Sequence, residues 1–98
     1  MGDKKSYITK IEEQLESWRQ EIYKFKVITE DVGEEEPDRQ IRYYQVIEDI
    51  VAKEKSVAEK LSDLKKSSET EWHQLKSEIE ALGESLASAI ESARTVVN

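Results

Sequence analysis

Residues 32–38 read Val-Gly-Glu-Glu-Glu-Pro-Asp, and this stretch decides how the chain folds. Gly33 suits the residue after a helix C-terminus, because it has no Cβ and can adopt a left-handed conformation. Pro37 suits the first position of a helix, because its missing N–H would have no partner there. The glutamates before it favour the positive end of the next helix dipole. The stretch therefore predicts a tight link, residues 33–37, between two helices.

Apolar residues before the link recur at alternating steps of three and four, which is the heptad spacing of a coiled coil. Charged side chains fill the positions between them and form a solvated face. The pattern predicts a helix over about residues 3–32. Its apolar seam consists of Ile8, Ile11, Leu15, Trp18, Ile22, Phe25, Thr29 and Val32.

The same spacing resumes after the link. This second seam consists of Gln40, Tyr43, Ile47, Ile50, Glu54, Val57, Leu61 and Leu64. A short link makes consecutive helices antiparallel. One register then brings seam against seam throughout, and it places Val32 near Gln40 and Ile11 near Leu61. We therefore expect residues 3–32 to pair with the first half of the second helix.

That register sets Trp18 opposite Glu54, which is the one charged residue on the seam. An indole N–H can donate a hydrogen bond to a carboxylate. We predict such a contact between Trp18 and Glu54, either direct or through a water. A polar group at a seam position would fix the register at some cost in stability.

Beyond Leu64 the apolar series continues through Ser68 and Trp72 to Val97. The two four-residue steps between Leu64 and Trp72 form a stutter, which a continuous helix absorbs by slight unwinding. No Gly or Pro interrupts the chain between Asp38 and Leu82. We therefore expect the second helix to extend over about residues 38–97, which makes an antiparallel helical hairpin with a long second helix.

In that hairpin the first helix covers only half of the second. The uncovered apolar stripe would be a sticky surface, so we expect a second copy of the chain, or another protein, to bury it. A homodimer is the simplest form of this assembly. The candidate assembly surface consists of Trp72, Leu75, Ile79, Leu82, Leu86 and Ile90.

The alternative fold is a compact three-helix bundle with a break near residues 67–70. Ser68 and Glu71 have the spacing of a capping box. The three segments, 3–32, 38–66 and 69–97, would then have nearly equal lengths. In either fold, residues 1–98 form a single all-α domain.

The composition limits the classes of function that the chain can have. The net charge is −7 and no cysteine is present, so disulfides are absent and phosphate backbones should repel the chain. Anionic membranes should bind it poorly. We find neither an apolar span long enough for a membrane nor a signal-peptide core, so the expected location is the cytoplasm.

No catalytic, cofactor or metal site is expected. His73 is the only histidine, whereas a zinc site needs three or four ligands. No Gly-rich loop and no HExxH, DxDxDG or GxSxG motif occurs. We predict a non-enzymatic scaffold or adaptor that acts through helix–helix association. The alternative is reversible binding to a lipid surface by the amphipathic segment 69–97.

Two stretches carry a resemblance to a known family. They are Tyr7-Ile-Thr-Lys-Ile-Glu-Glu-Gln-Leu-Glu-Ser-Trp-Arg-Gln-Glu-Ile22 and Glu59-Lys-Leu-Ser-Asp-Leu-Lys-Lys-Ser-Ser-Glu-Thr-Glu-Trp-His-Gln-Leu-Lys76. With them the chain resembles a family of small bacterial coiled-coil proteins described as hypothetical, stress-response or apolipoprotein-like. The resemblance implies a bacterial source and a link to stress, and it supplies no catalytic residue. The Glu-Glu-Glu-Pro link departs from the family pattern.

Overall fold

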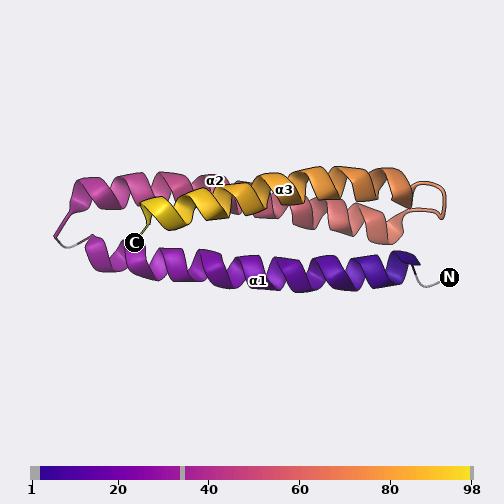
Figure 1. Cartoon of the computed structure of the whole chain (residues 1–98), viewed down its shortest axis with the longest axis horizontal. Coiled ribbons are helices and arrows are strands. Elements are labelled where there is room, and N and C mark those ends of the chain that lie inside the picture. Colours follow the sequence, from indigo (N-terminus) through magenta and orange to yellow (C-terminus); the bar gives the residue numbers. More distant parts are fainter. Residues whose placement is uncertain (1–2, 34, 98) are drawn as a thin grey trace.

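Three helices lie side by side in the computed structural model of the chain, which describes residues 3–33 and 35–97 (Figure 1). Helix α1 spans Asp3–Val32, α2 spans Pro37–Lys66 and α3 spans Trp72–Val96. The all-α class is confirmed, and the architecture is the three-helix bundle that was the alternative fold. Residues 1, 2, 34 and 98, which include one glutamate of the link, lie outside the described residues.

The long second helix expected from the stutter is wrong, because the chain leaves the helix at Ser67. This residue has extended backbone angles (φ −76°, ψ 157°), and its N–H donates to the Leu64 carbonyl over 3.1 Å. The Nζ of Lys4 in α1 donates to the Ser67 carbonyl over 2.5 Å. Basic side chains commonly satisfy the carbonyls that a helix end leaves free.

Ser68 then starts the next helical turn. Its carbonyl accepts from the Trp72 N–H over 3.2 Å, and its Oγ accepts from the Glu71 N–H over 3.3 Å. Serine hydroxyls compete with helix bonds and cap helix starts well. Two adjacent serines therefore end one helix and begin another without Gly or Pro.

The link between α1 and α2 follows the expected punctuation, but Gly33 acts differently. No described glycine has a positive φ, so the predicted left-handed conformation is wrong. Gly33 is needed instead for the space that it leaves, because a Cβ at this position would lie 2.0 Å from Nε2 of Gln40. That amide nitrogen donates to the Thr29 carbonyl over 3.2 Å and ties the two helices together beside the turn.

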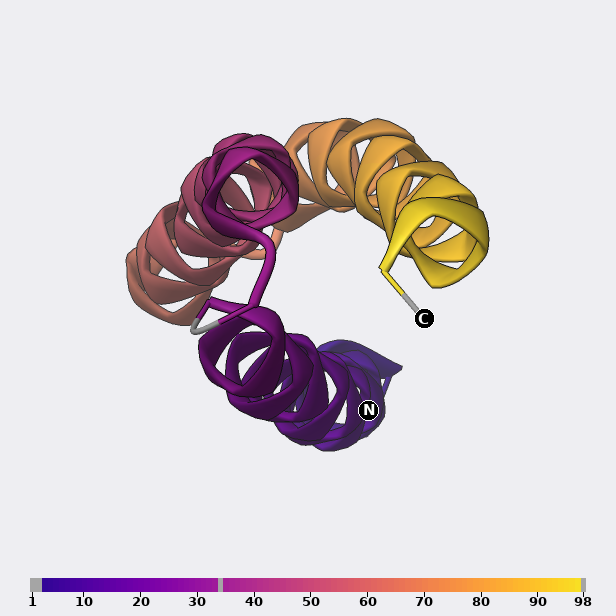
Figure 2. The same cartoon turned by 90° about the vertical axis from the view of Figure 1, so that its left-hand side faces the viewer.

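Helix α2 is the central helix of the bundle. It packs extensively against both α1 and α3, whereas α1 and α3 contact each other little, and the end-on view shows α2 between them (Figure 2). Seam residues of all three helices form one core, in which Val57, Leu64 and Leu86 are fully buried. Thr29 is also fully buried, and its hydroxyl donates to the Phe25 carbonyl over 2.7 Å.

Candidate interaction surface

The residues predicted to form an exposed assembly surface lie in the core of their own chain. Trp72, Ile79, Leu86 and Ile90 expose 4% or less of their surface, and Leu75 and Leu82 are half-buried against the same core. The break at Ser67 folds α3 back along α2, so the apolar stripe is covered by α1 and α2. This stripe is therefore not available for assembly in the folded chain.

Among the described residues Trp18 and Glu54 form no direct hydrogen bond, and a contact between them through a water stays a prediction. Glu54 is paired with Arg19, the residue after Trp18, whose Nε donates to the Glu54 carboxylate. Guanidinium–carboxylate bonds are charge-assisted and stronger than a bond from a neutral indole. Trp18 turns toward α3 instead, where its Cη2 atom lies 3.5 Å from the position that a Cβ on Gly83 would occupy.

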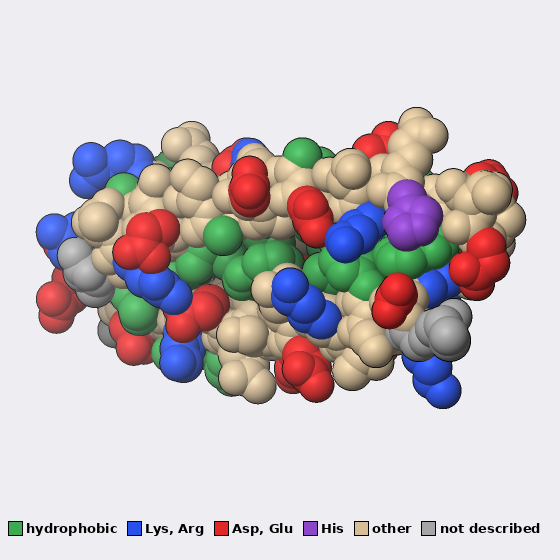
Figure 3. Space-filling model, turned by 45° about the vertical axis from the view of Figure 1, so that its right-hand side comes forward, with side chains coloured by type: hydrophobic (Ala, Val, Ile, Leu, Met, Phe, Trp, Pro, Cys, Tyr) green, Lys and Arg blue, Asp and Glu red, His purple; other side chains and the backbone are tan. Residues whose placement is uncertain are grey.

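A groove runs between α1 and α3 and has a volume of about 360 Å³. Its floor includes the buried Val57 of α2. The space-filling view shows hydrophobic side chains along its bottom and charged ones along its edges (Figure 3). We call this feature the α1–α3 groove. Its walls include Lys10, Gln14 and Trp18 of α1 and Glu80, Gly83 and Glu84 of α3.

Contacts on either side of the groove join its two walls. At one end the Tyr7 hydroxyl donates to the Lys76 carbonyl over 3.3 Å, and the Tyr7 ring lies 6.3 Å from the Trp72 ring. Burial, with the nearby Glu80 carboxylate, raises the pKa of Tyr7 to about 12. At the other end Arg94 pairs with Glu21 over 3.6 Å.

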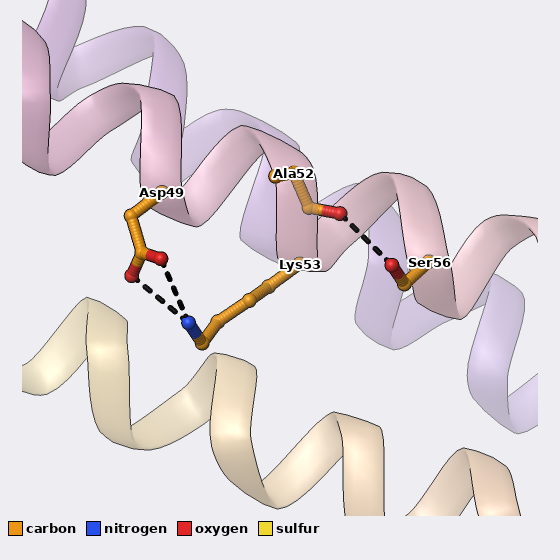
Figure 4. Close-up of polar contacts among 4 residues, drawn as sticks. All are labelled: Asp49, Ala52, Lys53 and Ser56. Atoms are coloured by element: carbon orange, nitrogen blue, oxygen red, sulfur yellow. Dashed lines mark hydrogen bonds and ion pairs between the residues drawn. The ribbon is translucent and has the colours of Figure 1, made fainter.

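The two closed sides of the bundle carry ion pairs close to the helix contacts. Lys65 of α2 pairs with Glu12 of α1 over 2.9 Å, and Lys60 of α2 pairs with Glu78 of α3 over 3.6 Å. Within α2, Lys53 is held by both oxygens of Asp49 (Figure 4). The charges beside α2 are thus largely satisfied within the chain.

The edges of the α1–α3 groove differ from those closed sides. Among residues 3–33 and 35–97, the only ion pair between α1 and α3 is Arg94–Glu21. Lys10, Glu80 and Glu84 line the open part of the groove and are exposed. The groove therefore combines an apolar floor with edge charges that make no ion pair in the described part of the chain.

In the described part of the chain, no group of three or more candidate metal ligands lies together. His73 is exposed, with its ring 4.2 Å from that of Trp72. The expectation that the protein has no catalytic, cofactor or metal site stays a prediction. None of the described helices has both the length and the apolar character needed to cross a membrane.

Comparison of the chain with models of protein families, with curated proteins and with solved structures finds no match. The resemblance to small bacterial coiled-coil proteins therefore stays a prediction. The candidate interaction surface is therefore defined by its geometry alone. Heptad spacing could not find the α1–α3 groove, because the groove exists only once the break at Ser67 has folded α3 back beside α1.

Proposed function

We propose that this protein is a non-enzymatic scaffold or adaptor that acts through helix–helix association at the α1–α3 groove. The observation that carries the proposal is the asymmetry of the bundle. Two of its sides are closed by packing and ion pairs, whereas the third leaves an apolar floor edged by Lys10, Glu80 and Glu84, which make no ion pair within the described residues. A helix laid along this groove would contact both walls, as a further helix does in a larger bundle.

A helix suits the groove better than a small molecule does. The groove lies between two helices that run in the same direction in a molecule 54 Å long. Small-molecule sites usually have a few buried polar groups that orient the ligand. In the described residues every buried side-chain nitrogen or oxygen already has a hydrogen-bond partner, and the charged side chains of the groove, such as Lys10 and Glu80, are exposed at its edges.

Reversible lipid binding by segment 69–97 would need a larger rearrangement. The apolar side chains that would enter a lipid surface are in the core, and α3 would have to leave the bundle to present them. Flotation with neutral and with anionic vesicles tests this hypothesis, and binding to neither would remove it. The bacterial source, the cytoplasmic location and the link to stress are likewise predictions.

Photo-cross-linking from the groove tests the proposed function in the cell that produces the protein. A benzophenone amino acid replaces Ala87, which is exposed in the groove. The matched control carries it at Ala81, which is exposed elsewhere on α3. We expect protein adducts from position 87 that position 81 does not form. Equal adducts from both positions, or none from either, would contradict the proposal.

A further inference from the structure

We propose that the partner in the α1–α3 groove is the same groove of a second copy of the chain, with the two bundles parallel and related by a two-fold axis along their length. This inference rests on the proposed function and names its partner. It follows from the order of charges along the two edges of the groove.

Three contacts show which residues of α1 and of α3 lie at the same height, that is, at the same position along the long axis of the bundle. Helices α1 and α3 both begin at the same end of the bundle (Figure 1). Tyr7 bonds to the Lys76 carbonyl, Trp18 lies against Gly83, and Glu21 pairs with Arg94. These contacts place Lys10 near the height of Glu80. Going along the bundle, the α1 edge therefore presents a base and then an acid, Lys10 and Glu21.

From the height of Lys10 onward, the α3 edge presents the opposite order. Lys76 precedes this height, with its ammonium over the Tyr7 ring, and Glu80 and Glu84 come next, followed by Arg94. A two-fold axis along the bundle brings α1 of one protomer against α3 of its partner at equal height. Lys10 of each protomer then meets Glu80 of the other. Complementary potentials of this kind fix the register of an interface.

The antiparallel arrangement has the opposite electrostatics. With its axis across the middle of the groove, α1 would face α1 and α3 would face α3. The glutamates Glu80 and Glu84 would then meet the same glutamates of the second copy. Like charges placed opposite one another across an interface disfavour that partner arrangement, so the charges select the parallel pair.

The middle of the groove suits a close approach of two helices. Gly83 and Ala87 have small or no side chains, and the half-buried Trp18 lies beside them. Protein interfaces commonly have an aromatic residue at their centre and charged residues around it. In the proposed pair, each Trp18 would lie at the centre and the charged edges would surround it.

A charge exchange between two variants tests the pairing. Lys10→Glu and Glu80→Lys each place two like-charged pairs across the proposed interface. Each variant alone should therefore dimerise about tenfold more weakly than the wild type. In an equal mixture of the two, every pair joins a glutamate to a lysine. We expect the mixture to recover the dimer mass of twice 11.4 kDa by light scattering.

The mixture is decisive because a charge effect inside one chain cannot be repaired by another chain. Lys5→Glu, which makes the same charge change away from the groove, is the control and should dimerise like the wild type. Failure of the mixture to recover the dimer would overturn the inference. So would a wild-type protein that stays monomeric at high concentration. Cross-links from position 87 to other proteins alone would overturn the inference and leave the proposed function standing.

Discussion

Gly83 is a helical glycine that the surrounding structure does not require. A glycine inside a helix costs about 0.5–1 kcal/mol relative to alanine. A Cβ at position 83 would make only an ordinary contact with Trp18, at 3.5 Å. The space beside it belongs to the α1–α3 groove, so Gly83 keeps one wall of the groove low at the expense of helix stability.

Gly83→Ala should therefore raise the free energy of unfolding by about 0.5–1 kcal/mol, measured by urea denaturation. Gly33→Ala is the matched comparison and should lower it by about 1 kcal/mol. The new Cβ there must displace the Gln40 side chain from its bond to Thr29. Destabilisation by Gly83→Ala would show that this wall of the groove is already filled.

The protonation of the Tyr7 hydroxyl is coupled to folding. Its pKa rises from the ordinary value of 10.0 to about 12 in the folded chain, mainly because it is buried. Between these values the unfolded chain loses the hydroxyl proton and the folded chain keeps it. The unfolded state then binds fewer protons, so stability must fall as the pH rises from about 10 to about 12.

Tyr7→Phe removes this dependence and should flatten the decline in unfolding free energy between about pH 10 and 12. It should also cost about 1 kcal/mol at neutral pH, because the bond to Lys76 is lost. Denaturant titrations over a pH series measure both effects. Tyr23→Phe is the control, since Tyr23 is 68% exposed. Equal slopes for Tyr7→Phe and the wild type would contradict the assignment.

At the scale of the elements, heptad spacing and turn residues predict the first helix and the start of the second, but not where the second helix ends. The three-and-four spacing and Pro37 predict α1 and the start of α2, because both depend only on local sequence. The end of α2 stayed an alternative, because it depends on serine capping bonds and on Lys4, which is distant in the sequence. The candidate site could not be predicted because it requires α3 beside α1, which follows from the break that ends α2.

Ser68→Ala tests the break between α2 and α3. The Ser68 hydroxyl accepts from the Glu71 N–H and donates to the Glu71 carboxylate over 2.7 Å. Its loss should lower the free energy of unfolding by about 1 kcal/mol, as at other N-caps. Ser88→Ala, at an exposed position within α3, should be neutral or slightly stabilising. An equal effect of the two substitutions would argue against the capping role of Ser68.

At the scale of the whole molecule, the central claim is that the open side of the bundle is its association surface. The break at Ser67 lets one chain bury the apolar stripe that a long helix would expose. The proposed association would then use the α1–α3 groove, whose exposed surface is small beside a typical stable interface. The expected self-association is therefore reversible and dependent on concentration.

The most direct test is the solution mass, measured by light scattering over a range of concentrations, for the wild type and two arginine variants. The account predicts that the wild type approaches twice 11.4 kDa as the concentration rises. Ala87→Arg should stay near 11.4 kDa because the arginine fills the groove, and Ala81→Arg should behave like the wild type. A dimer that Ala87→Arg leaves intact would contradict the account.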